Sequence, residues 1–267
     1  MLNLVDFTGK NIIITGASKG IGRDTAVLLS KLGAKLILIA RNESGLLNTQ
    51  KLLDGNGHKY YSFDLSYITD IECLVNQIVL DVGPIDGLVY AAGINSDRPL
   101  KMFTPKKVED VIKINLGGYI ELIRCITKKR KYNFGMRIVG VSSVGARKGS
   151  KAHIAYSTSK SGMEAATRCL AIELADKGIC VNTVAPGMIN TEMYTDFLKG
   201  AGGTNGKPNL ELLERQYLGL GRTSDVAAAI AFLLSSAAKF ITGICLPVDG
   251  GQLTNINLFQ EDIQNDY

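Results

Sequence analysis

The feature that most constrains the fold is an alternation of short apolar runs with longer stretches of helical periodicity. The runs, rich in β-branched and aromatic residues, are NIIIT (11–15), KLILIA (35–40), YYSFDL (60–65), DGLVYAAG (86–93), RIVGVSS (137–143), CVNTVAP (180–186) and ICLPVDGG (244–251). Strands that alternate with helices form βαβ units, which build a parallel sheet with helices on both faces. The nearly continuous apolar character is typical of strands buried on both sides. We therefore predict an α/β fold, a single doubly wound domain.

The composition fits one folded unit of this kind. The 267 residues are 46% apolar, enough for a continuous core, and no stretch resembles an interdomain linker. The longest apolar stretches fall well short of the ~18 to 20 residues needed to cross a bilayer. The N-terminal segment lacks the features of an export signal. We expect a soluble, cytoplasmic protein without membrane contact, with its domain in residues 1–251 and a C-terminal tail in 252–267.

Charge and cysteine content argue against nucleic-acid and metal binding. The formal charge is +5, from 30 basic and 25 acidic residues, and no basic stripe is interleaved with aromatic residues. The five cysteines stand singly without a CxxC pair, so neither a disulfide framework nor a zinc site is expected. The only basic cluster is KKRK at 128–131, which fits a solvated helix end.

The first apolar run leads into a glycine-rich turn, TGASKGIG (15–22), which contains Gly16, Gly20 and Gly22. Such a turn is either a tight connection between a strand and a helix or a seat for a phosphate, and the glycines alone do not decide. In the second case, backbone amides at the helix start would approach a pyrophosphate, which the helix dipole also favours. Doubly wound sheets bind ligands beyond the carboxyl ends of their strands, where this turn lies.

Two cations indicate which dinucleotide such a turn would bind. Arg41 directly follows the second run, about 22 residues past the turn, where dinucleotide folds contact the adenosine ribose. An acidic residue there would bind the free 2′-hydroxyl of NAD. Arg41 and Lys19, which lies inside the glycine-rich turn, would instead pair with a 2′-phosphate. We therefore predict NADP(H) as the cofactor.

A second group of residues indicates the chemistry. The segment 142–160, SSVGARKGSKAHIAYSTSK, brings Ser143, Tyr156 and Lys160 into one neighbourhood. Tyr156 and Lys160 are four residues apart, so on a helix they share one face. A tyrosine with an ordinary pKa of ~10 is a poor acid or base at neutral pH, but an adjacent ammonium stabilises its phenolate. The YxxxK spacing alone is common in proteins without any such role; together with the serine it describes acid–base machinery without a metal.

These motifs together resemble the short-chain dehydrogenase/reductase family over nearly the whole chain. The family's ordered motifs are similar to TGASKGIG, FDLS (63–66), AAG (91–93), INLGG (114–118), SS with YSTSK, VNTVAPGMINTEM (181–193) and ITGICLPVDGG (241–251). Tyr90 and Ala91 depart from this pattern, since the family usually has two asparagines there. The resemblance implies a single-domain Rossmann-type fold.

The resemblance also implies a role for each catalytic position. Tyr156 would donate a proton to the substrate oxygen, and Ser143 would hold that oxygen. Lys160 would bind the nicotinamide ribose and lower the pKa of Tyr156, and Asn115 would hold a water of a proton relay behind Lys160. Hydride would pass from the nicotinamide to a carbonyl carbon. The implied cofactor-binding residues are Gly16, Ser18, Lys19, Gly20, Ile21, Gly22, Arg41, Asp64, Leu65, Ala91, Ala92, Gly93, Tyr156, Lys160, Pro186, Gly187, Ile189 and Thr191.

Within the family, three segments are similar to those of the 3-oxoacyl-[acyl-carrier-protein] reductases: 93–103, 185–193 and 221–251. The resemblance implies NADPH-dependent reduction of a 3-oxoacyl group in fatty-acid synthesis and assembly as a homotetramer. It further implies that an acidic acyl carrier protein docks on Lys128 to Lys131 and on Lys177.

Two other interpretations stay open. The glycine-rich segment 194–221, interpreted as a substrate flap, and the tail leave a steroid, a sugar or another small ketone or alcohol as the substrate. A catalytically silent NADP-binding regulatory protein is the second, because a fold alone does not imply activity. Against the second stand Asn115, Ser143, Tyr156 and Lys160, which form a complete set.

Overall fold

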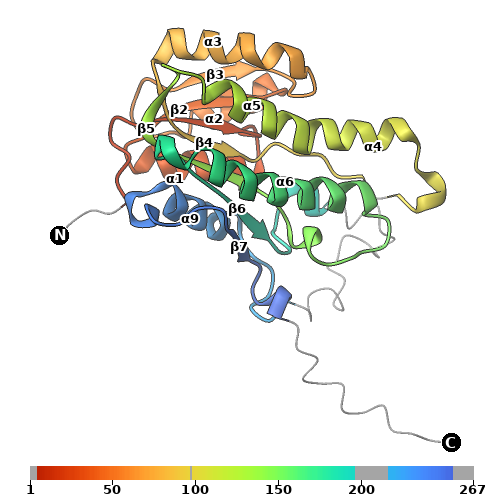
Figure 1. Ribbon diagram of the computed structural model, residues 1–267. Helices are drawn as coiled ribbons and strands as arrows, with labels where there is room; N and C mark the ends of the chain where they lie inside the picture. Colours follow the sequence, from red (N-terminus) through yellow and green to blue (C-terminus); the bar gives the residue numbers. More distant parts are fainter. Residues whose placement is uncertain (1–4, 97, 196–215, 255–267) are drawn as a thin grey trace, which may run out of the picture.

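The computed structural model describes residues 5–96, 98–195 and 216–254, and it confirms the doubly wound Rossmann-type domain (Figure 1). Its seven strands pair in parallel in the order β3-β2-β1-β4-β5-β6-β7. The strands are β1 (Asn11–Thr15), β2 (Lys35–Ala40), β3 (Lys59–Ser62), β4 (Ile85–Tyr90), β5 (Tyr132–Val141), β6 (Cys180–Pro186) and β7 (Cys245–Val248). Because the order reverses between β1 and β4, a crevice is expected at their carboxyl ends.

Helices cover both faces of this sheet. The helices of the described residues with named bounds are α1 (Gly20–Lys31), α2 (Glu43–Gln50), α3 (Ile71–Val82), α4 (Pro105–Ile112), α5 (Gly118–Ile126), α6 (Ile154–Glu173) and α9 (Thr223–Leu234). One apolar core joins the sheet to α3, α5 and α6, and the other joins it to α1, α2 and α9. Along β1, Ile13 belongs to the first core whereas Ile12 and Ile14 belong to the second. Strand side chains alternate between faces, so a strand covered on both sides is apolar throughout.

All of the predicted strands are present, but several are shorter than their apolar runs at the carboxyl end. β3 ends at Ser62, β4 at Tyr90 and β5 at Val141. The residues FDL, AAG and SS at the ends of these runs therefore lie just past the strands rather than in them. These are the motif residues, and the shortening places them in the loops along the crevice.

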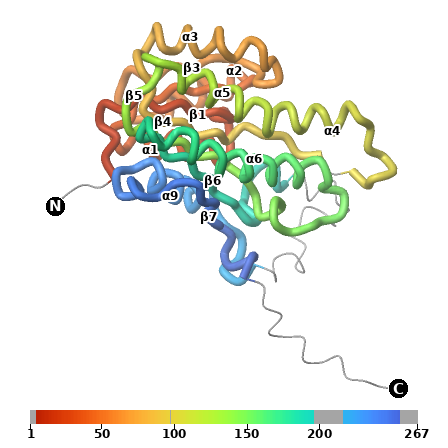
Figure 2. Tube along the Cα trace, in the orientation of Figure 1, coloured from red at the N-terminus to blue at the C-terminus, as the bar shows by residue number. Residues whose placement is uncertain are grey.

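Helices α4 and α5 form one continuous rod that lies beside α6 (Figures 1 and 2). They are joined by a π-helical turn, Lys113–Gly117, in which the Gly118 amide donates to the Lys113 carbonyl oxygen. A π-turn contains one extra residue relative to an α-helix and is frequent at functional sites. This turn contains Asn115.

The edge strand β7 contains a proline. The Thr183 amide donates to the Ile244 carbonyl and the Gly187 amide to the Val248 carbonyl, so Ile244 and Val248 face β6. Pro247 is adjacent to Val248 and faces the open edge of the sheet, the position at which a strand tolerates proline.

Two predicted segments fall largely outside the described residues. Of the predicted flap at 194–221, residues 196–215 are not described, and of the tail at 252–267, residues 255–267 are not. The predicted boundary at residue 251 is followed by a short 3-10 turn, Gln252–Thr254. Lys148 Nζ donates to the Gln252 carbonyl, so the described start of the tail contacts the domain.

Candidate active site

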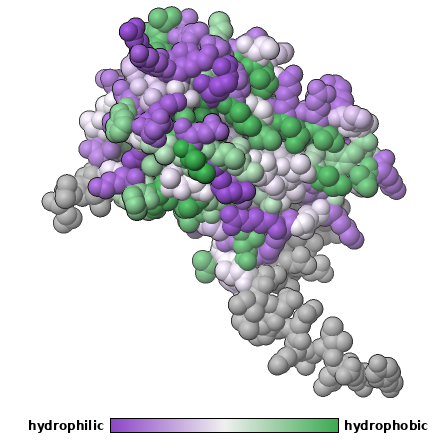
Figure 3. All heavy atoms as spheres, in the orientation of Figure 1, coloured by the Kyte–Doolittle hydropathy of each residue, from purple (hydrophilic) through white to green (hydrophobic). Residues whose placement is uncertain are grey.

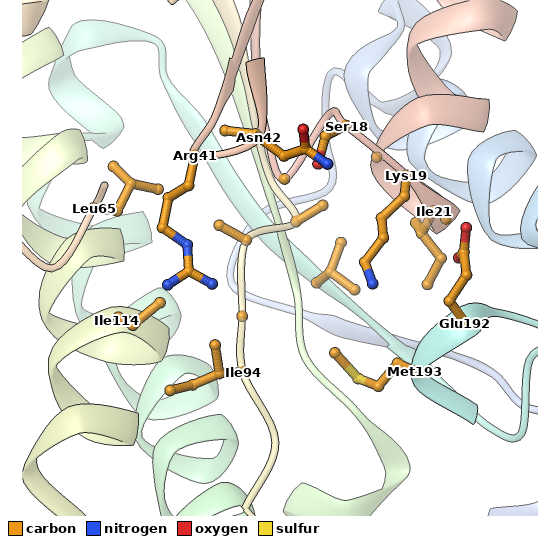
Figure 4. Close-up of a pocket in the computed structure, with 18 of the residues that line it drawn as sticks. Ser18, Lys19, Ile21, Arg41, Asn42, Leu65, Ile94, Ile114, Glu192 and Met193 are labelled. Atoms are coloured by element: carbon orange, nitrogen blue, oxygen red, sulfur yellow. The ribbon is translucent and has the colours of Figure 1, made fainter. Parts of the chain in front are cut away.

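Two adjoining cavities open where the strand order reverses. The larger, about 680 Å³, is bounded by the glycine-rich turn, the end of β2 and residues 63–65 (Figure 4). The smaller, about 270 Å³, contains Ser143, Tyr156 and Lys160 in its wall. They share the lining residues Ile21, Ala91, Gly93, Val141, Thr191 and Met193. Every predicted site residue except Asn115 lines one of the two cavities.

Close backbone packing explains two of the glycines in the turn. Gly16 has a positive φ of 66°, and a Cβ there would lie 2.7 Å from the Ala91 carbonyl oxygen. A Cβ at Gly22 would lie 2.4 Å from the Gly16 carbonyl oxygen. The Lys19 side chain, at the N-cap of α1, makes no capping hydrogen bond. The Lys19 side chain therefore does not occupy the first amides of α1, and the role of these amides in binding an anionic ligand stays a prediction.

Arg41 and Lys19 extend into the larger cavity from two sides (Figure 4). The Arg41 side chain is 62% exposed, and its Nη1 lies 3.6 Å from Asp64 Oδ2. Asp64 Oδ1 accepts from the Ser66 amide at 2.9 Å. Asp64, which is predicted to bind the adenine, therefore also pairs with Arg41, which is predicted to bind a 2′-phosphate. The roles of both residues stay predictions.

The larger cavity also contains residues that the sequence analysis did not single out. These are Ala40, Asn42, Phe63, Ile94, Ile114, Val141 and Glu192. Asn42 caps α2, since its Oδ1 accepts from the Gly45 amide at 3.0 Å. Asparagine before a helical stretch is a recognisable capping signal, so this one residue could have been found from the sequence. Glu192, near Lys19 in Figure 4, had no such signal.

Ser143, Tyr156 and Lys160 come together because β5 ends beside the start of α6. Ser143 Oγ accepts from the Gly145 amide at 3.1 Å, and this turn fixes the serine just beyond β5. Tyr156 lies in the first turn of α6, and Lys160 lies one turn later with its Nζ 5.8 Å from the Tyr156 ring centroid. The common face that their spacing predicts is present, and it lines the smaller cavity.

Lys160 is a buried ammonium, only 4% exposed. Its Nζ donates to the Val141 carbonyl oxygen at 2.7 Å. Burial lowers the pKa of Lys160 to about 8, because removing a cation from water disfavours its charged form. A shifted pKa at the wall of a cavity is typical of functional sites.

Asn115 lies behind the cavities, fully buried, and its side chain joins two neighbouring segments. Its Oδ1 accepts from the Ile94 amide at 2.8 Å, and its Nδ2 donates to the Ile94 carbonyl at 3.0 Å. Nδ2 also donates to Ser159 Oγ at 2.9 Å. A Cβ at Gly93 would lie 3.3 Å from both Asn115 Oδ1 and Lys160 Nζ, so these two residues meet there. The relay water expected beside Asn115 stays a prediction.

The predicted nicotinamide loop, from Pro186 to Thr191, is held by a glutamine that sequence reasoning missed. Gln216 is 2% exposed. Its Oε1 accepts from the Met188 amide at 2.8 Å, and its Nε2 donates to the Met188 carbonyl at 3.0 Å. A Cβ at Gly187 would lie 2.4 Å from Gln216 Oε1, so glycine is required for this contact. No local sequence signal marks a contact between residues so far apart in the chain.

The basic cluster 128–131 lies at the opposite end of the sheet. Helix α5 ends at Ile126, so the cluster follows the helix and precedes β5. Lys128 forms an ion pair with Glu72 of α3, and Lys131 Nζ donates to Asn76 Oδ1 at 2.5 Å. Lys129 and Arg130 are exposed. Ser143, by contrast, follows the carboxyl end of β5, so the basic cluster and the predicted catalytic residues of one chain lie at opposite ends of the strands.

Within residues 5–96, 98–195 and 216–254, no three His, Cys, Asp or Glu side chains gather as metal ligands would. None of the helices in those residues has the length and apolar character of a membrane span.

The fold and the paired cavities at the switch in strand order are typical of the class of Rossmann-type dinucleotide-binding proteins, and comparison with known proteins identifies the family. Residues 16–252 match the family described as Enoyl-(Acyl carrier protein) reductase. The 3-oxoacyl-[acyl-carrier-protein] reductase FabG of Rickettsia conorii is 38% identical over 251 residues, which are 94% of this chain and 99% of the relative. The chain belongs to the short-chain dehydrogenase/reductase family, whose members use nicotinamide cofactors.

Solved structures agree with this assignment. Levodione reductase superimposes with a TM-score of 0.85 at 30% identity, covering 93% of this chain and 99% of that one. A variant of actinorhodin polyketide ketoreductase, solved with NADPH, superimposes with a TM-score of 0.84 at 30% identity. It covers 92% of this chain and 98% of that one.

Proposed function

We propose that this oxidoreductase uses NADPH to reduce a 3-oxoacyl thioester carried by an acyl carrier protein. The observation that carries the proposal is the wall formed by Ser143, Tyr156 and Lys160 in a cavity that adjoins the dinucleotide crevice. Similarity to 3-oxoacyl-[acyl-carrier-protein] reductases, such as that of Rickettsia conorii, supports the substrate class.

The residues present fit a nicotinamide dinucleotide. At Gly16 and Gly22 a side chain would collide with backbone, so only glycine allows the tight turn that precedes the start of α1. The uncapped first turn of α1 offers amide donors for them. Lys19 and Arg41 supply two cations for a 2′-phosphate, which supports NADP(H) over NAD(H). The structural relative solved with NADPH is consistent with this preference.

The chain's own residues would orient the ketone and move one proton. When bound, the reduced nicotinamide supplies hydride to the carbonyl carbon. Because Ser143 Oγ accepts from the Gly145 amide, its own hydrogen is left to hold the carbonyl oxygen. Tyr156 donates the proton that this oxygen takes up, and the Lys160 ammonium stabilises the phenolate that remains.

The basic residues predicted to dock a carrier protein lie far from the mouth of the smaller cavity on the same chain. The predicted docking residues Lys129, Arg130 and Lys177 precede β5 and β6, so they lie at the amino ends of the strands. The mouth of the smaller cavity lies at the carboxyl ends of the strands. A carrier on these charges would therefore deliver its cargo to a neighbouring subunit of the proposed homotetramer.

Exposed apolar side chains support the homotetramer. Figure 3 shows apolar side chains over the face that α4, α5 and α6 form. On α5 and α6, Ile120, Ile154 and Ile172 are exposed, the last by 79%. Phe240 is fully exposed beside the segment that leads into β7. Exposed apolar side chains gathered on one surface are commonly buried between the subunits of a symmetric oligomer.

The test is oxidation of NADPH by purified protein against a panel of acetoacetyl thioesters, steroids and keto sugars. We expect turnover with the thioester and a further gain when it is linked to an acyl carrier protein. A protein that reduces only a sugar or a steroid would point to the alternative substrates. A protein that binds NADPH but reduces no member of a broad ketone panel would be the silent regulatory protein.

A further inference from the structure

The π-turn between α4 and α5 leaves one backbone carbonyl without its usual helical partner. In an α-helix the Gly118 amide would donate to Ile114, four residues earlier, but here it donates to Lys113. The Tyr90 hydroxyl donates to the Ile114 carbonyl oxygen instead, at 2.6 Å. Buried carbonyls in native proteins are almost always paired. Tyr90 thus supplies the donor that the wider turn lacks.

Tyr90 is buried in a tightly packed environment that leaves room for its hydrogen bond to Ile114. Tyr90 is the last residue of β4 and is fully buried. A Cβ at Gly118 would lie 2.5 Å from its hydroxyl oxygen, so only glycine leaves room for the bond. Its ring meets Tyr119 edge-on, with centroids 5.4 Å apart. Burial raises the pKa of Tyr90 far above neutrality, so its hydroxyl stays a donor.

Asn115 depends on the register of this turn. Successive residues of a helix are rotated by about 100°, so loss of the extra residue would turn Asn115 away from Ile94 and Ser159. The Asn115 side chain holds Ile94, in the loop between the two cavities. It also bonds Ser159, whose Oγ donates to the Tyr156 carbonyl at 2.7 Å. The turn is thereby connected to the helix that carries Tyr156 and Lys160.

We propose that Tyr90, which stands where the family pattern has asparagine, is a positioning residue whose hydroxyl holds the π-turn and thereby sets Asn115 against Ile94 and Ser159. Its expected effect on catalysis rests on the proposed ketone reduction, whereas its effect on the turn does not. The role of Tyr90 in the turn and the proposed ketone reduction can therefore be refuted independently of each other.

The first test compares two phenylalanine variants. Tyr90→Phe removes only the hydroxyl, and we expect kcat for ketone reduction to fall about tenfold or more, since small misplacements of a reacting geometry are costly. The Kd for NADPH should change less than about threefold, because the main cofactor contacts lie elsewhere. Tyr119→Phe is the matched control: it removes another buried tyrosine hydroxyl from the same core, one bonded to Thr167 Oγ1 at 2.8 Å. Its kcat should stay near that of the unmodified protein.

A double-mutant cycle separates positioning from general destabilisation. If Tyr90 acts through Asn115, Tyr90→Phe should cost little further kcat in an Asn115→Ala background. Full additivity of the two losses would overturn the inference. So would an equal loss of kcat in Tyr90→Phe and Tyr119→Phe.

Hydrogen exchange tests the turn without any substrate. In Tyr90→Phe the amides of residues 113–118 should exchange about tenfold faster, whereas Tyr119→Phe should leave them unchanged. Unchanged exchange in Tyr90→Phe overturns the inference even if ketone reduction is confirmed. If Tyr90→Phe exchanges faster but the unmodified protein reduces no ketone, the role of Tyr90 in the turn is supported and the proposed function is refuted.

A second pair of variants perturbs the bond between the Tyr90 hydroxyl and the Ile114 carbonyl without changing either residue. This pair replaces the first test if Tyr90→Phe does not fold. Gly118→Ala places a Cβ against the Tyr90 hydroxyl, and it should reproduce the faster exchange and the loss of kcat. Gly117→Ala is its control, since a Cβ there would lie at an ordinary 3.4 Å from Ile68. Equal behaviour of the two alanine variants would contradict the proposal.

Discussion

Lys160 Nζ donates a hydrogen bond of 2.7 Å to the carbonyl oxygen of Val141, so the end of β5 directly holds the ammonium on α6. This one contact joins the strand that leads to Ser143 with the helix that carries Tyr156. It also keeps the Lys160 cation in the interior of the protein. The burial of this charge lowers the free energy of unfolding by an amount that varies with pH.

We expect Lys160→Met to remove a pH-dependent penalty on stability. The folded pKa of Lys160 is about 8 against a reference of 10.5, so the unfolded chain binds more protons between these values. Stability of the unmodified protein should therefore rise with pH through this window, and the full penalty should be present below about pH 8. Relative to Lys160→Met, the gain should reach up to about 3 kcal/mol. Urea unfolding of both proteins at a series of pH values measures it, and parallel curves would contradict it.

Tyr156→Phe keeps the ring and removes the acid. We expect turnover to fall at least ~100-fold with NADPH affinity nearly unchanged, because the phenol acts on the substrate oxygen. Steady-state kinetics and fluorescence titration measure the two quantities. Tyr67→Phe, at an exposed tyrosine outside both cavities, is the control and should behave as the unmodified protein. Lys160→Ala should differ by weakening cofactor binding too. Near-normal turnover of Tyr156→Phe would mean that another group donates the proton.

Arg41→Asp should erase or reverse the preference for NADPH over NADH. Two charge-assisted contacts, partly offset by desolvation, predict a preference of about 10- to 1000-fold in kcat/KM for the unmodified protein. The ratio of kcat/KM for the two cofactors is the measurement. Lys51→Asp makes the same reversal of charge at an exposed residue outside the cavity, so it should leave the ratio as it was. Equal kcat/KM values for both cofactors in the unmodified protein would refute the preference.

Replacing Arg130 and Lys177 by Glu should raise KM severalfold for a carrier-linked substrate and leave a small thioester unaffected. These charges would act by steering the acidic carrier, so the effect should shrink as salt exceeds ~0.15 M. Kinetics with both substrates at two salt concentrations give the comparison. If both substrates respond alike, the charges do not serve carrier docking.

Light scattering should give a mass near four chains of 28.7 kDa at micromolar concentration. Ile172→Asp places a charge on the exposed face of α6 and should shift the mass toward smaller species. A mass near one chain for the unmodified protein would contradict the homotetramer and the delivery of cargo between subunits.

Local patterns made the fold predictable from the sequence, and the family resemblance implied many of the residues that line the two cavities. Tyr156 and Lys160 share a face because helix geometry fixes their relation, and the strands were recognisable from their apolar runs. Strand ends were less accurate: YAAG continues an apolar run, yet β4 stops at Tyr90. The loop turns there to pack on Gly16, a contact between distant segments.

Contacts between distant segments also explain what the sequence did not reveal. Gln216 and the loop at Met188 meet only through the fold, and neither has a local signal. The π-turn at Lys113–Gly117 looks like an uninterrupted helix in sequence. The Tyr90 hydroxyl that bonds to the Ile114 carbonyl of this turn comes from β4, which lies 24 residues earlier in the chain.

Pro247 in the edge strand β7 disfavours the addition of a strand from another chain to this sheet. An open sheet edge is a template on which another chain can add a strand, and this leads to fibrils. Pro247 offers no amide on that side, and β7 is only four residues long. A continuous sheet across two copies is therefore disfavoured, and contact along this edge must rely on side chains. A closed assembly of fixed size is compatible with such an edge, whereas an endless ribbon of sheets is not.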